Sequence, residues 1–60
     1  MDKYELKNKL SDIYAGISKL AGTLVEKGCQ DEETAEIRSR VLSLLNDTNE
    51  AIRKEIHEIY

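Results

Sequence analysis

The sequence predicts an all-α protein, a two-helix antiparallel hairpin that dimerises into a four-helix bundle. The chain of 60 residues has no proline, tryptophan or phenylalanine, and 35% of its residues are charged. Apolar residues recur every three or four positions on both sides of one short glycine-containing segment. Such a composition and spacing are typical of helical bundles rather than β domains. We therefore expect a single helical-hairpin domain over residues 1–60.

The first helix is predicted over about residues 3–27. Its apolar residues follow the 4, 3, 4, 3, 4 spacing of a heptad seam, which predicts that they face the core: Leu6, Leu10, Ile13, Ile17, Leu20 and Leu24. Asp2 is a suitable N-cap for this helix. Lys27 supplies a cation in the last turn, and Gly28 is expected in the left-handed conformation that commonly follows a helix end.

A short turn is predicted at residues 28–30, followed by a second helix over about residues 31–59. Asp31 is a good N-cap, and Glu32 and Glu33 place negative charge beside the unpaired amides of the first turn. A connection this short usually brings two helices together in antiparallel orientation.

The second helix carries an apolar stripe that averages close to 3.67 residues per turn: Ile37, Val41, Leu45, Thr48, Ile52, Ile56 and Ile59. The segment NDTNE, residues 46–50, could instead be a turn, with Asp47 capping a third helix and Glu50 completing a capping box. No glycine or proline interrupts the segment, and the apolar phase continues across it. We predict a continuous helix.

Two polar residues interrupt this stripe, and the sequence leaves their orientation open. Thr48 and Asn49 could face the bundle interior and fix its register, as a buried asparagine does in coiled coils. They could equally face water as weak helix formers. The stripe is wide enough to include Thr48 while excluding Asn49.

A chain of this length buries little surface and requires additional stabilisation. The single cysteine, Cys29, cannot form an internal disulfide, and no His/Cys cluster could hold zinc. We expect no metal and no cofactor. Oligomerisation is the remaining means of stabilisation, so the sequence predicts a homodimer.

The predicted interface lies mainly in residues 10–25, where only Asp12 and Lys19 are charged. The small residues Gly16, Ala21 and Gly22 would let another helix approach closely, although an exposed helix also tolerates single glycines. The tyrosines at positions 4, 14 and 60 are suited to an interface, and Tyr14 is the best candidate for a contact anchor, although an ordinary role at the edge of the core is the favoured alternative for it. The predicted dimer or partner interface comprises Leu10, Ile13, Tyr14, Gly16, Ile17, Ala21, Leu24, Val25, Leu45 and Ile52.

No residue pattern predicts catalysis. His57 is the only histidine and has no orienting acid and nucleophile at a suitable spacing, so we interpret it as a solvated residue of the last helical turn. Cys29 is either a redox-sensitive thiol or a small apolar residue that folds back onto Leu24 or Val25. We favour the second role and expect a protein that is not an enzyme.

The formal charge of −3, from 9 basic and 12 acidic residues, indicates neither a nucleic-acid footprint nor a DNA mimic. Arg38 and Arg40 are the most cationic feature of the second helix, but the negative charges of Glu36 and Asp47 on the same helix weaken their positive potential. RNA binding is therefore the weaker alternative to a solvated, ion-paired face. The chain also lacks an apolar stretch that could span a bilayer, and we expect a cytoplasmic protein.

These observations favour a non-catalytic regulator or inhibitor that self-associates and binds a larger protein. Chains of this size are frequent in phages and mobile elements, where blocking a host protein is a common strategy. The alternative is an RNA-binding four-helix dimer, which would resemble plasmid copy-number regulators in architecture only, because no motif is shared. A phosphatase-like effector of sporulation control has a similar helical layout, but no matching catalytic side chain is present.

Overall fold

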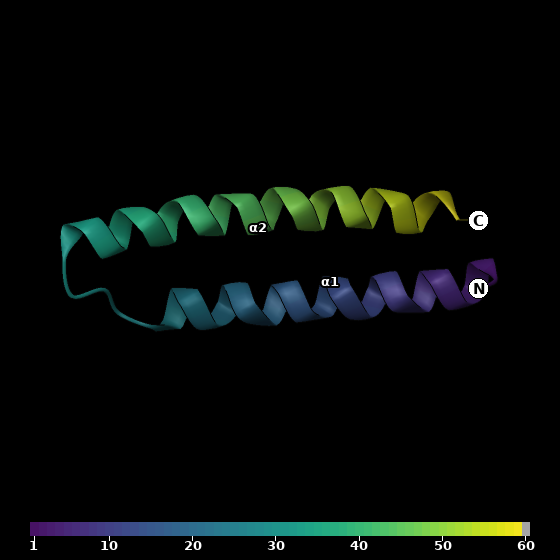
Figure 1. The fold of residues 1–60 in the computed structure, drawn as a ribbon, viewed down its shortest axis with the longest axis horizontal. Coiled ribbons are helices and arrows are strands. Elements are labelled where there is room, and N and C mark those ends of the chain that lie inside the picture. Colours follow the sequence, from purple (N-terminus) through teal and green to yellow (C-terminus); the bar gives the residue numbers. More distant parts are fainter. Residues whose placement is uncertain (60) are drawn as a thin grey trace.

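The computed structural model describes residues 1–59 and confirms the all-α hairpin. Helix α1 spans Lys3–Glu26 and helix α2 spans Glu32–Glu58, and the two lie side by side in antiparallel orientation (Figure 1). The hairpin measures 46 × 15 × 14 Å, with the turn at one end and both termini at the other (Figure 1). Tyr60, for which we predicted an interface role, lies outside the described residues.

The aspartate predicted to cap each helix does so. The side chain of Asp2 accepts a hydrogen bond of 2.8 Å from the backbone amide of Glu5, and Asp31 accepts one of 2.7 Å from the amide of Thr34. Hydrogen bonds from the side chain and the backbone amide of Thr34 lower the pKa of the Asp31 carboxyl. Both helix starts are therefore determined by residues that the sequence identifies.

The end of α1 differs from the sequence-based expectation. The helix ends at Glu26, Lys27 is extended with φ of −77°, and no residue within 1–59 has a positive φ, so Gly28 is not in the left-handed conformation. The cation at this helix end comes instead from α2. Arg38 Nη1 donates hydrogen bonds to the carbonyls of Leu24, at 3.5 Å, and Lys27, at 2.8 Å. This guanidinium satisfies carbonyls that a left-handed glycine would otherwise help to satisfy.

Helix α2 runs unbroken through residues 46–50, so the alternative of a turn at this segment is wrong. The hydroxyl of Thr48 donates to the carbonyl of Leu44 at 2.8 Å and remains on an exposed side chain. Such a bond back to the preceding turn satisfies a hydroxyl inside a helix without breaking it.

The seam between the helices follows a heptad pattern, but its phase differs from the predicted one. The partly buried residues of α1 that recur at spacings of three and four are Lys7, Leu10, Tyr14, Ile17, Ala21 and Leu24. Leu10, Ile17 and Leu24 were predicted correctly. The prediction was wrong for Leu6, Ile13 and Leu20, which are exposed. The apolar stripe of α1 is wider than one neighbouring helix can cover, and α2 covers the weaker side of it.

The same shift occurs in α2. Its partly buried residues are Ala35, Arg38, Leu42, Leu45, Asn49, Ile52 and Ile56, and Ile59, directly after the helix, is partly buried as well. Ile37, Val41 and Thr48, which were predicted to face the core, are exposed, and the residue after each of them takes its place in the seam. Asn49 therefore faces α1, whereas Thr48 does not.

Among residues 1–59, no side chain is fully buried. Each helix has only one neighbour, so every seam residue keeps part of its surface in contact with water. A two-helix hairpin of this kind lacks the closed core that stabilises most domains.

Candidate functional site

The most prominent surface of the hairpin is apolar. Six large aliphatic side chains, between 37% and 66% exposed, form what we call the apolar face: Leu6, Ile13 and Leu20 from α1, and Ile37, Val41 and Leu44 from α2. Isolated exposed aliphatic residues are common on protein surfaces, but six residues at helical spacing on two adjacent helices form a pattern.

Helical geometry places all six residues on the same side of the hairpin. Successive residues of an α-helix point about 100° apart. Ile13 and Leu20 each precede a seam residue of α1, and Val41 and Leu44 each precede a seam residue of α2. In antiparallel helices that face each other, the positions before the seam lie on one side and those after it lie on the other. Both helices therefore contribute to one continuous face.

Charge is unevenly distributed along this face. The positions that precede the seam are Leu6, Lys9, Ile13, Gly16, Leu20 and Thr23 in α1, and Thr34, Ile37, Val41, Leu44, Thr48, Ala51, Glu55 and Glu58 in α2. The three charged residues, Lys9, Glu55 and Glu58, all lie in the half near the termini. The half near the turn is therefore free of charge and contains most of the apolar residues.

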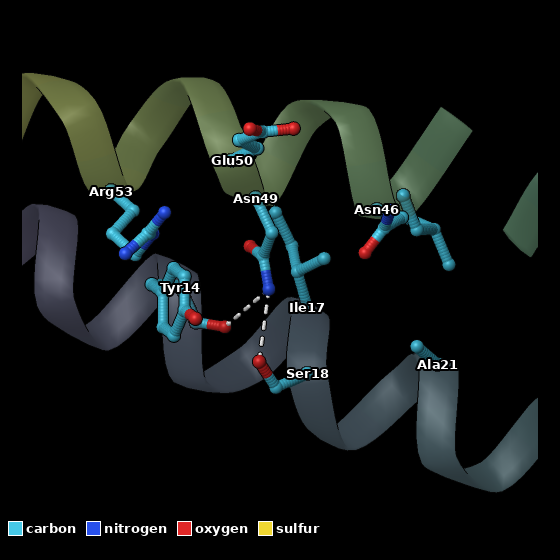
Figure 2. Close-up of a pocket in the computed structure, with 9 residues that line it drawn as sticks. Tyr14, Ile17, Ser18, Ala21, Asn46, Asn49, Glu50 and Arg53 are labelled. Atoms are coloured by element: carbon cyan, nitrogen blue, oxygen red, sulfur yellow. Dashed lines mark hydrogen bonds between the residues drawn. The ribbon is translucent and has the colours of Figure 1, made fainter. Parts of the chain in front are cut away.

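The opposite side of the seam carries a groove of about 420 Å³, which we call the polar groove (Figure 2). It is lined by Tyr14, Ile17, Ser18, Ala21, Leu45, Asn46, Asn49, Glu50 and Arg53. Glu50 and Arg53 lie one turn apart on α2 and give the groove one charge of each sign. The two sides of the hairpin thus differ in chemistry, one being apolar and the other polar.

Asn49 is the polar centre of the seam. Its Nδ2 donates hydrogen bonds to Ser18 Oγ at 2.9 Å and to the backbone carbonyl of Tyr14 at 3.3 Å, which Figure 2 shows as dashed lines. Its Oδ1 is buried and accepts no hydrogen bond. The side chain therefore ties α2 to one position along α1, as expected for an asparagine that fixes register, and leaves one carbonyl oxygen unsatisfied.

The structure divides the predicted interface residues between several environments. Most of them contribute to the seam between α1 and α2: Leu10, Tyr14, Ile17, Ala21, Leu24, Leu45 and Ile52. Ile13 and Gly16 lie on the apolar face side, and Val25 is 65% exposed elsewhere. Of the apolar face, the predicted interface includes only Ile13 and leaves out Leu6, Leu20, Ile37, Val41 and Leu44. The signal that could have identified them is the second apolar column, which precedes each seam position.

The glycines of α1 do not serve contact between the two helices. A Cβ atom at Gly16 or Gly22 would meet no atom within 4 Å. The close approach predicted at these residues therefore does not occur within the hairpin. A role in packing against a second subunit stays a prediction.

The side chains that could bind a metal or take part in a reaction do not lie together. Within the described chain, no group of three His, Cys, Asp or Glu side chains could hold a metal ion. Cys29 is a free, partly buried thiol in the turn, and His57 lies in the last turn of α2. Over the same residues, neither helix is both long enough and apolar enough to cross a membrane.

Comparison of the chain with protein-family models, curated proteins and solved structures finds no match. The functional argument therefore rests on the two surfaces of the hairpin.

Proposed function

We propose that this chain is a non-catalytic regulator or inhibitor that self-associates and acts by binding another protein. The apolar face is the observation that carries the proposal, because it leaves six aliphatic side chains exposed on a hairpin without a closed core. A second copy that covers this face would complete a four-helix bundle with the apolar face at its centre.

The energy available from burying the apolar face is of the size that such a dimer requires. Full burial of one Leu, Ile or Val side chain contributes about 1.5–3 kcal/mol, so covering six side chains that are about half exposed contributes roughly 5–9 kcal/mol per chain. A pair would gain about 10–18 kcal/mol, against an association cost of roughly 4–15 kcal/mol. This balance supports a dimer of moderate stability.

The polar groove is the surface that such a dimer leaves free for a partner protein. It lies on the side opposite the apolar face, and its residues include Tyr14 and Arg53, two residue types that often dominate binding energies. A dimer would present two copies of this groove. We place this activity in the cytoplasm, with regulation of a host protein by a phage or mobile element as the setting.

Affinity capture tests this function. The 60-residue chain, immobilised through an N-terminal tag, is incubated with a lysate of the source organism, with and without nuclease, and the retained proteins are identified by mass spectrometry. We expect one protein to be retained in both conditions. Retention that disappears after nuclease treatment would support the RNA-binding alternative instead, and no specific retention would contradict partner binding.

Two variants give the capture experiment its specificity. Arg53→Glu reverses a charge in the polar groove and is expected to reduce retention by at least tenfold. Arg40→Glu is the matched control, because Arg40 is exposed on the same helix and does not line the groove. Equal retention by both variants would exclude the groove as the binding surface.

A further inference from the structure

We infer that the second copy packs in parallel, with the two turns at the same end of the four-helix bundle and the uncharged half of each apolar face against the same half of the other. This inference rests on the proposed self-association and adds the orientation of the two hairpins. It follows from the distribution of charge along the face.

The uncharged half of the face needs an uncharged partner. Between Ile13 and Thr23 in α1, and between Thr34 and Ala51 in α2, the positions that precede the seam carry no charge. The contacts of Asn49 with Ser18, and of Arg38 with Leu24, set a register in which Leu20 lies level with Leu44. In a parallel pair, Leu20 and Leu44 of one copy would therefore lie against the same two residues of the other copy, in the centre of the bundle.

An antiparallel pair that overlaps along its full length would be less favourable. It would lay Ile37 and Val41 of each copy against the end of the other copy that carries Glu55 and Glu58. Such an arrangement lays these carboxylates against aliphatic side chains, and Lys9, the one cation on this part of the face, offsets only one of the two negative charges. An antiparallel pair that overlaps only near the turns avoids this cost, but it leaves half of each 46 Å hairpin uncovered.

Small residues on the face permit close approach in the parallel arrangement. Gly16 and Thr23 flank Leu20 on α1, and a Cβ atom at Gly16 would meet no atom of the hairpin within 4 Å. The leucine and isoleucine side chains of a second copy could enter this space. In the same parallel arrangement, Lys9 and Glu55 of one copy lie near Lys9 and Glu55 of the other copy. This end of the bundle is near the termini and is accessible to water.

The natural cysteine allows a direct measurement of orientation. A nitroxide spin label is attached to Cys29, the only thiol of the chain, and the distance between labels is measured by double electron–electron resonance. A second sample carries the label at His57→Cys in a Cys29→Ser background, because His57 is exposed near the other end of the hairpin. Gln30→Cys in the same background replaces the first site if labelling of the partly buried Cys29 lowers helicity.

The parallel pair is expected to give short distances at both ends, no more than about twice the 15 Å width of one hairpin. A distance near or beyond the 46 Å length of the hairpin between labels at residue 57 would overturn the inference while leaving self-association intact. Absence of any dipolar signal at micromolar concentrations would remove both the orientation and the proposed dimer. The affinity-capture experiment would then still test whether a monomer binds a partner protein.

Discussion

Replacing Asn49 with leucine should stabilise the hairpin, because this residue places an amide in an otherwise largely apolar seam. Asn49 makes two hydrogen bonds to α1, through Ser18 and the carbonyl of Tyr14, and leaves its Oδ1 buried without a donor. The substitution removes all three features and supplies an aliphatic side chain at a heptad position. The sign of the effect depends on which of these contributions is largest.

The contributions can be compared from typical magnitudes. Two neutral hydrogen bonds contribute about 0.5–1.5 kcal/mol each, so their loss costs about 1–3 kcal/mol. Removal of an unsatisfied buried carbonyl recovers about 1–3 kcal/mol. Leucine at a partly buried position adds roughly 1–2 kcal/mol of apolar burial. We therefore expect a net stabilisation of about 1–2 kcal/mol, because Ser18 is exposed and can bond to water instead.

Thermal unfolding followed by circular dichroism measures this effect. Asn46→Leu is the matched control, since Asn46 is one turn away on the same helix and is exposed, so both variants share the same gain in helix propensity. For a chain of this size, 1 kcal/mol corresponds to about 4–8 °C in Tm. All samples need the same chain concentration, because self-association also raises Tm.

Asn49→Leu should unfold about 5–15 °C above the Asn46→Leu control, from the conversion of about 1–2 kcal/mol to Tm. A Tm equal to or below that of the control would refute this reasoning. It would mean that the two hydrogen bonds of Asn49 outweigh the burial of leucine, and that the unsatisfied oxygen costs little.

Three further substitutions test individual parts of the fold. Arg38→Leu should lower stability by about 1–2 kcal/mol, because the final carbonyls of α1 lose a charged donor; an unchanged Tm in thermal unfolding would contradict this. Asp31→Ala should lower the Tm at neutral pH, because the first turn of α2 loses the carboxylate that accepts from the amide of Thr34. The loss of stability of this variant should be present at pH values above the ordinary carboxyl pKa of 3.8 and should vanish as the pH falls through the lower pKa of Asp31 in the folded chain. A loss of stability that does not change with pH would exclude an electrostatic cap. Gly22→Ala should raise the urea midpoint through a gain of about 0.5–1 kcal/mol, since a Cβ there meets nothing within 4 Å; a loss would reveal a contact at this position.

The hairpin could be predicted from the sequence because its determinants are local. Asp2 and Asp31 identify the helix starts through a capping preference that acts within three residues. The apolar phase that passes through Asn46 to Glu50 without a break identifies α2 as continuous. Each of these signals is contained in a short stretch of chain.

The seam and the helix end depend on tertiary geometry, and here the sequence was insufficient. Ile13 and Tyr14 both belong to plausible apolar columns, and hydrophobicity alone favours Ile13. The structure places Tyr14 against α2 because one neighbour covers only part of a wide stripe. Arg38 caps α1 from 11 residues beyond Lys27, a contact that exists only once the turn has formed.

Sedimentation equilibrium of the unmodified chain at micromolar concentration tests the central claim most directly, namely that a second copy covers the apolar face. We expect a mass about twice the 6.9 kDa of one chain. The double variant Leu20→Lys, Leu44→Lys should shift to the mass of one chain, because it places four charges at the centre of the proposed interface. A wild-type chain that remains a fully helical, cooperatively unfolding monomer would contradict the claim.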